Sequence, residues 1–112
     1  MRVLLDHCVP KSLARYITGH SVQTCRRAGL DGLADGDLLR EMDGRFDALI
    51  TVDRGLRFQQ NTEALSFCIV VLHARSNSLE HLAPLVPQIL AVLASAMPAQ
   101  VHVIDGKLSR GP

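Results

Sequence analysis

The sequence predicts an α/β domain in three layers, with a mainly parallel sheet of four to five strands flanked by helices. Short apolar runs suit strands that are buried on both faces, as in a parallel sheet. Apolar residues at helical spacing separate these runs, which is typical of α/β proteins. The 112 residues are 47% hydrophobic, enough for one sizeable core. We therefore expect residues 1–112 to form a single domain.

The first half of the chain is predicted to begin with a strand, a short helix and a second strand. Arg2–Leu5 is a short apolar run, and Ser21–Cys25 is a weaker strand supported by its β-branched residues. Pro10 suits the first turn of a helix, and Gly19 can end that helix in the left-handed conformation. One apolar face of this helix is made by Leu13, Tyr16 and Ile17.

A second helix is predicted to begin at Asp35 or Asp37, after a glycine-rich loop over Gly29–Gly36. Either aspartate could cap this helix, because a carboxylate there accepts the free N–H groups of the first turn. Gly44 ends the helix, and the central strand Phe46–Val52 follows. The apolar residues at helical spacing are Leu38, Leu39 and Met42.

The second half begins with Leu56–Ala64, which is polar and is predicted to be a loop with room for one helical turn. Phe67–Leu72 is an uninterrupted apolar strand, and Val101–Ile104 is the final strand. Asp105-Gly106 is a tight-turn dipeptide that could fold Lys107–Arg110 back as a hairpin.

Ser78–Ala96 carries the longest helical pattern, although prolines at positions 84 and 87 would break a helix interior. A main helix that starts near Ala83 places Pro84 and Pro87 in its first turn, where proline is tolerated. Ser78–Leu82 would then be a separate turn. The apolar stripe consists of Leu82, Leu85, Val86, Ile89, Leu90 and Leu93.

Aspartates follow two of the predicted strands and begin a helix. Asp6 and Asp53 lie side by side if their strands are neighbours in a parallel sheet, and Asp35 can reach the same edge. Asp37 takes its place if Asp35 faces away. Three converging carboxylates would raise each other's pKa, and a divalent cation would remove that repulsion. Hard oxygen ligands select Mg²⁺ or Mn²⁺, which can activate water and brace a phosphodiester.

Three segments carry a resemblance to a known family: VLLDHCVP at Val3–Pro10, GLAD at Gly32–Asp35, and LITVDR with FQQN between Leu49 and Asn61. With them, Met1–Asn61 resembles the short PIN-like domains grouped as predicted toxin components of bacterial toxin–antitoxin pairs. The second half fits only as the strand–helix–strand completion that this fold requires. The resemblance implies a metal-dependent endoribonuclease whose catalytic and metal-binding acids are Asp6, Asp35 and Asp53.

RNA would be the substrate of such an enzyme. Lys11, Arg54 and Arg57 follow strand ends, so they could face phosphates near the acids. Gln60 and Asn61 could hydrogen-bond sugar or bases, or could simply form a polar surface. Three further arginines of the first half, Arg15, Arg26 and Arg27, are interpreted as solvated helix and loop charges.

Two other functions are compatible with the sequence. The first is a receiver-like phosphoacceptor module, in which Asp53 accepts a phosphoryl group beside Asp6 and Lys107. The second is a degenerate PIN-like binding protein, because His7 and Gly55 stand where family members often have further acids. Such a protein would pair with an antitoxin or with a second copy of itself through the apolar face of Leu79–Leu93.

The remaining properties exclude several classes of protein. The net charge is +1, so only a local basic patch could attract nucleic acid. We expect no signal peptide and no membrane span, because no apolar run is long enough. Three scattered cysteines, Cys8, Cys25 and Cys68, are expected to be reduced thiols in a cytoplasmic protein.

Overall fold

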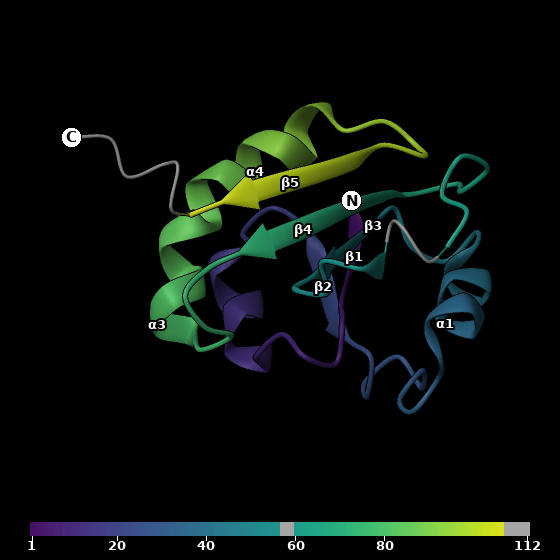
Figure 1. Ribbon diagram of the computed structural model, residues 1–112, viewed down its shortest axis with the longest axis horizontal. Helices are drawn as coiled ribbons and strands as arrows, with labels where there is room; N and C mark the ends of the chain where they lie inside the picture. The colour runs from purple at the N-terminus through teal and green to yellow at the C-terminus, as the bar shows by residue number, and fades with distance from the viewer. Residues whose placement is uncertain (57–59, 107–112) are drawn as a thin grey trace.

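The computed structural model of the protein describes residues 1–56 and 60–106. Within them, five strands form one sheet in the order β2-β1-β3-β4-β5, and all neighbouring strands are parallel (Figure 1). The predicted hairpin of Lys107–Arg110, like Arg57, lies outside the described residues. The strands are β1 Arg2–Leu5, β2 Ser21–Thr24, β3 Ala48–Thr51, β4 Cys68–His73 and β5 Val101–Asp105.

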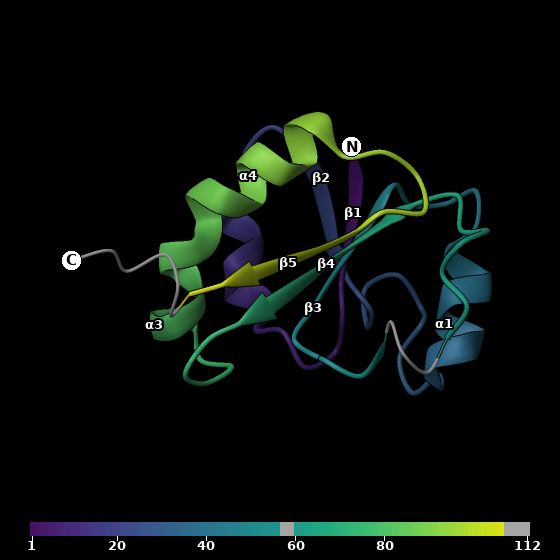
Figure 2. The same cartoon turned by 45° about the horizontal axis from the view of Figure 1, so that its top comes forward.

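Helices cover both faces of the sheet, which confirms the predicted α/β architecture in three layers. The 3₁₀ helix η1 (Lys11–Tyr16) packs on one face with α3 (Leu79–Leu82) and α4 (Val86–Ser95), while α1 (Asp35–Met42) packs on the other (Figure 2). Alternate residues of each strand point to opposite faces. In β1, for example, Val3 and Leu5 belong to one buried cluster and Leu4 to the other.

The start of α1 differs from the prediction that an aspartate side chain caps it. The N-cap residue is Ala34, and it makes no side-chain hydrogen bond to the helix. Asp35 and Asp37 lie within the first turn instead, where a negative charge still interacts favourably with the helix dipole. At the other end, Gly44 adopts a φ of +75°, a left-handed conformation that glycine reaches without strain.

The prolines of the C-terminal region divide the predicted long helix into shorter segments. Four residues of α3 are followed by the 3₁₀ helix η2 (Ala83–Leu85), and α4 begins at Val86 rather than near Ala83. Pro84 therefore lies at the start of η2 and Pro87 at the start of α4. Each proline occupies a first turn, as the sequence predicted, but the two turns belong to different segments.

Two further features concern the predicted environment of the protein. Over the described parts of the chain, the structure has no helix that combines the length and the apolar character needed to cross a membrane. Cys8, Cys25 and Cys68 are free thiols.

Candidate functional site

The candidate site lies where β1 and β3 meet at the carboxyl edge of the sheet. The strand order reverses direction at this pair, and open α/β sheets bind ligands in the crevice outside such a switch point. Leu5 is in register with Ile50, and the Asp6 N–H donates to the Ile50 carbonyl at 2.9 Å. Asp6 and the end of β3 are therefore side by side, as the strand-end pattern predicted.

Asp6 is a buried carboxylate with an ordered set of donors. Its residue is only 2% exposed. The Thr51 hydroxyl donates to Asp6 Oδ2 at 2.7 Å, and the His7 backbone N–H donates to Oδ1 at 2.8 Å. The imidazole Nδ1 of His7 also lies 2.9 Å from Oδ1. Because both oxygens have partners, Asp6 has a fixed orientation at the edge of the sheet.

Thr51 connects the two strand-end acids and was not identified as a site residue from the sequence. Its hydroxyl is fully buried, donates to Asp6 and accepts the Asp53 backbone N–H at 3.0 Å. Asp53 in turn accepts the Gly55 N–H through Oδ1 at 2.9 Å, which forms a turn directly after the strand. The sequence did contain a signal for Thr51, because its hydroxyl is the one polar side chain in an apolar strand and lies two residues before Asp53.

Asp35 brings the third carboxylate to this edge from the first turn of α1. Burial raises the pKa of Asp35 most. The charges of Asp53 and Asp6 and a hydrogen bond to Asp53 raise this pKa further, while His7 acts in the opposite direction. Two neighbouring carboxylates can act on Asp35 in this way only because they lie nearby. The fold therefore gathers Asp6, Asp35 and Asp53 around one edge, although they are far apart in the sequence.

Within residues 1–56 and 60–106, lysine and arginine side chains do not pair with this group. Among the residues that the structure describes, none of the three acids forms an ion pair with lysine or arginine, and His7 is the only ionisable partner of Asp6. Asp37, the predicted substitute, pairs instead with Arg40 on the exposed side of α1. Over the described residues, no lysine or arginine thus offsets the mutual repulsion of the site carboxylates, unlike that of Asp37, which lies two residues after Asp35 in the same helix.

The donor chemistry of the three acids suits a hard divalent cation. Carboxylate oxygens are the ligands that Mg²⁺ and Mn²⁺ prefer, and a cation would offset the repulsion that raises the Asp35 pKa. The described part of the chain contains no group of three His, Cys, Asp or Glu side chains that is already arranged to hold a metal ion. The three acids therefore do not form a metal site that is arranged in advance.

The structure describes four of the five predicted substrate residues. Lys11 and Arg54 are exposed, while Arg57 lies outside the described residues. Gln60 and Asn61 line an open hollow of about 530 Å³ beside α1. A Cβ built on Gly36 would lie 3.3 Å from Gln60 Oε1, so the absence of a side chain next to Asp35 lets this amide approach the helix. Gln60 thus packs against α1, and the lining of this hollow contains none of the three acids.

The cysteines around Asp6 are protonated thiols at neutral pH. Burial and the nearby Asp6 charge raise the pKa of Cys25 to about 11, and they also raise the pKa of Cys8. Neither thiol has the lowered pKa that marks a reactive cysteine. This agrees with the interpretation of Cys8 as a packing residue.

The apolar face expected to receive a partner is occupied by the protein itself. Leu82, Leu85, Ile89 and Leu93 are buried in the cluster that covers one face of the sheet. The hypothesis of a binding protein that uses the Leu79–Leu93 face therefore loses its proposed surface.

Comparisons of the chain with protein-family models, with curated proteins and with solved structures found no match. The candidate site is consequently defined by its own residues and geometry.

Proposed function

We propose that the protein is a PIN-like endoribonuclease that hydrolyses RNA with Mg²⁺ or Mn²⁺ held by Asp6, Asp35 and Asp53. The observation that supports this most strongly is the convergence of three carboxylates without a lysine or arginine partner among the described residues. Like charges that gather at one edge without such a partner are costly for the fold. Function is a common reason for such a cost.

Different parts of the fold position the three carboxylates. Asp6 is fixed by Thr51 and His7, so one ligand is oriented before any cation binds. Asp53 lies on a turn tied to the same hydroxyl, and Asp35 approaches from a helix start. Divalent ions bound by these oxygens would supply an activated water and charge compensation for the phosphodiester. Thr51 is a positioning residue.

A role as the toxin of a toxin–antitoxin pair, acting in the cytoplasm, is part of this proposal. It rests on the resemblance of Met1–Asn61 to the PIN-like toxin components and on the positions of Asp6, Asp35 and Asp53 at strand and helix ends. The proposed partners are RNA, an antitoxin protein and a second copy of the chain.

The experiment compares RNA cleavage by the wild type, Asp6→Asn and Asp53→Asn, each with Mn²⁺, with Mg²⁺ and with a chelator. We expect cleavage by the wild type only with metal. Each substitution should reduce it by more than about 100-fold, because even outer partners of metal ligands contribute 10–100-fold. Asp47→Asn removes one carboxylate from the opposite edge and should retain activity. Equal cleavage by all four proteins would reject the proposal.

The strand order also favours a second candidate, a receiver-like phosphoacceptor. The order β2-β1-β3-β4-β5 is that of flavodoxin-like sheets, which include receiver domains, and Asp53 follows β3 at the switch point. In this case Asp53 would form an acyl phosphate with a small phosphodonor. Intact-protein mass spectrometry after incubation with acetyl phosphate and Mg²⁺ tests it: the wild type would gain one phosphoryl group and Asp53→Asn none. Lys107, the third residue of this hypothesis, lies outside the described residues.

A further inference from the structure

The edge strand β2 borders a second polar feature, a cleft of about 720 Å³ between β2 and η1. Four cations line it, two from η1 and two from the segment that follows β2. They are Lys11, Arg15, Arg26 and Arg27, and all four are exposed. The lining contains no acidic residue. Three of these cations were interpreted from the sequence as solvated helix and loop charges, and the fold brings them together in one cleft.

These cations differ from Arg2 and Arg40 because they have no carboxylate partner among the described residues. Arg2 pairs with Asp47 and Arg40 pairs with Asp37. Over residues 1–56 and 60–106, none of the four cleft cations forms an ion pair. The overall net charge is only +1, so the positive charge of the cleft is local. A cleft with this charge pattern attracts a polyanion.

The cleft leads to the acidic edge described above. Thr24, the last residue of β2, is in register with Leu5, and the Cys25 N–H donates to the Leu5 carbonyl at 3.2 Å. The carboxyl end of β2 therefore lies beside Asp6, and Arg26 and Arg27 follow directly. A chain lying along β2 would have one end at the carboxylates.

The lining also indicates which polyanion fits. Apart from the cations, it is made mainly of hydroxyl and amide side chains, such as Ser21 and Gln23, with Ala14 and Val22 as its small apolar members. An acidic peptide added to an edge strand would need pockets for alternate side chains, and the lining offers no large apolar ones. Aromatic residues are absent from the lining, so bases would not be stacked there. Phosphates and sugar hydroxyls match these donors best.

We propose that the cleft between η1 and β2 binds the sugar–phosphate backbone of single-stranded RNA and leads it to the Asp6 edge. Its second part, that the bound strand is cleaved at the Asp6 edge, rests on the proposed ribonuclease function. Binding in the cleft should be insensitive to base sequence and strongly dependent on salt, because phosphate contacts release counterions.

Binding can be measured separately from cleavage. Fluorescence anisotropy with a labelled single-stranded RNA of mixed sequence, in chelator and with the Asp53→Asn protein, reports affinity over a range of salt concentrations. Adding Arg26→Gln and Arg27→Gln should reduce the slope of log K against log[salt] by about 1.4, or 0.7 per cation lost from a single-strand contact. Arg45→Gln with Arg75→Gln removes the same charge outside the cleft and should leave the slope close to that of the parent. Urea unfolding midpoints confirm that the variants are folded.

The outcomes separate the cleft from the acidic site. Equal slopes for the cleft and control variants would overturn the proposal, and so would displacement of RNA by polyglutamate at equal charge concentration. In active protein, the cleft variants should raise KM and leave kcat unchanged. If the wild type cleaves no RNA but the cleft variants still lose salt-dependent RNA binding, the proposal for the cleft is supported and the proposed ribonuclease function is rejected. If the wild type cleaves RNA but the cleft variants keep the parent slope of log K against log[salt], only the proposal for the cleft is rejected.

Discussion

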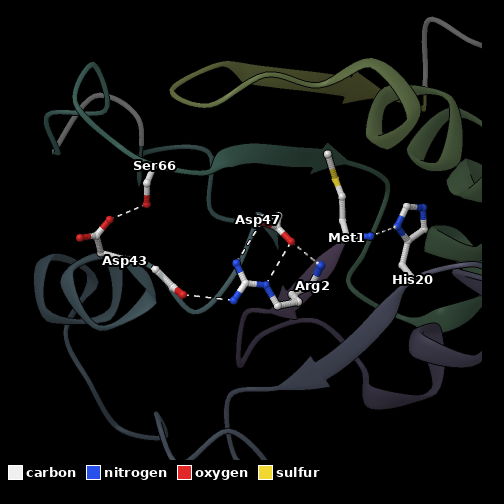
Figure 3. Close-up of polar contacts among 7 residues, drawn as sticks. Met1, Arg2, His20, Asp43, Asp47 and Ser66 are labelled. Atoms are coloured by element: carbon white, nitrogen blue, oxygen red, sulfur yellow. Dashed lines mark hydrogen bonds and ion pairs between the residues drawn. The ribbon is translucent and has the colours of Figure 1, made fainter.

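The two ends of the central strands treat their carboxylates in opposite ways. At the amino edge, Asp47 accepts hydrogen bonds from the Arg2 backbone and guanidinium, the shortest at 2.7 Å, and Arg2 also donates to the Gly44 carbonyl (Figure 3). The Arg2 contacts hold the pKa of Asp47 below its ordinary value. At the carboxyl edge, burial and the nearby acids raise the pKa of Asp35 instead.

This difference separates a carboxylate that supports the fold from carboxylates that are available for another partner. Asp47 already has a cationic partner, Arg2. The same guanidinium also donates to the Gly44 carbonyl, so it connects β1 to the turn after α1. Asp6, Asp35 and Asp53 lack a lysine or arginine partner within the described residues. A bound divalent cation would give the carboxyl edge the compensation that Arg2 provides at the amino edge.

The largest expected effect comes from supplying that cation. Mn²⁺ at 100 times its dissociation constant should stabilise the wild type by about 2.7 kcal/mol, because it binds the folded state only. For a domain of this size the melting temperature would rise by about 10 °C. Differential scanning fluorimetry with and without Mn²⁺ measures the shift within each protein, so any effect of a substitution on stability alone cancels.

Variants at the two edges should respond differently to Mn²⁺. Asp6→Asn should lose the shift, and Asp47→Asn should keep it, because Asp47 is already neutralised by Arg2. A wild-type protein that gains nothing from Mn²⁺, or an Asp6→Asn protein that gains as much, would remove the contrast between the edges.

The next effect in size comes from removing the hydroxyl that supports the acids. Thr51→Val keeps the shape of the side chain but leaves buried Asp6 Oδ2 and the Asp53 N–H without a shared partner. An unsatisfied buried group costs about 1–3 kcal/mol, so we expect a destabilisation of about 2 kcal/mol in urea unfolding. Thr24→Val is the matched control, since that hydroxyl accepts an exposed N–H of Arg27. A smaller loss for Thr51→Val than for Thr24→Val would contradict the supporting role.

The smallest expected effect is on folding stability, which the substitutions Asp35→Asn and Asp47→Asn should change in opposite directions at neutral pH. The folded-state pKa of Asp35 is raised, so its contribution to stability is lost as the pH rises above the ordinary aspartate value. Asp35→Asn should therefore stabilise the metal-free protein at neutral pH, by on the order of 0.5 kcal/mol after solvent screening. The folded-state pKa of Asp47 is lowered, so its stabilisation is present above the ordinary value and is lost at lower pH.

Urea unfolding at neutral pH and near pH 3 measures both variants. Asp47→Asn should be slightly less stable than the wild type at neutral pH, and its deficit should shrink in acid. The gain of Asp35→Asn should also shrink in acid, as the wild-type carboxyl becomes protonated. Two variants that shift stability in the same direction at neutral pH would show that the edges do not differ in this way.

Several structural features could be read from local patterns because they depend on neighbouring residues. The apolar run around Leu49 predicted a buried strand, and the spacing of Leu38, Leu39 and Met42 predicted α1. Boundaries were less accurate. The central strand is Ala48–Thr51 rather than Phe46–Val52, since the Phe46 N–H donates to the Met42 carbonyl in the turn after α1.

Other features depend on which segments become neighbours, and local patterns do not contain that information. The pairing of Asp6 with Thr51 follows from the register of β1 and β3, whose residues are 45 positions apart. The convergence of Lys11 with Arg26 and Arg27 likewise requires η1 to lie beside β2. Asp37 pairs with Arg40 three residues further along the same helix, a contact that the sequence spacing already allows, whereas only the tertiary structure directs Asp35 toward Asp53.

The sequence by itself determined the α/β class, the two strand-end acids and the first turn of α1, because periodicity and turn residues act over a few positions. Only the tertiary structure decided that β1 and β3 are adjacent, that Thr51 joins Asp6 to Asp53, and that four cations share a cleft. The physical reason is that charge and hydrogen-bond energies depend on distance in space, which the order of residues does not specify.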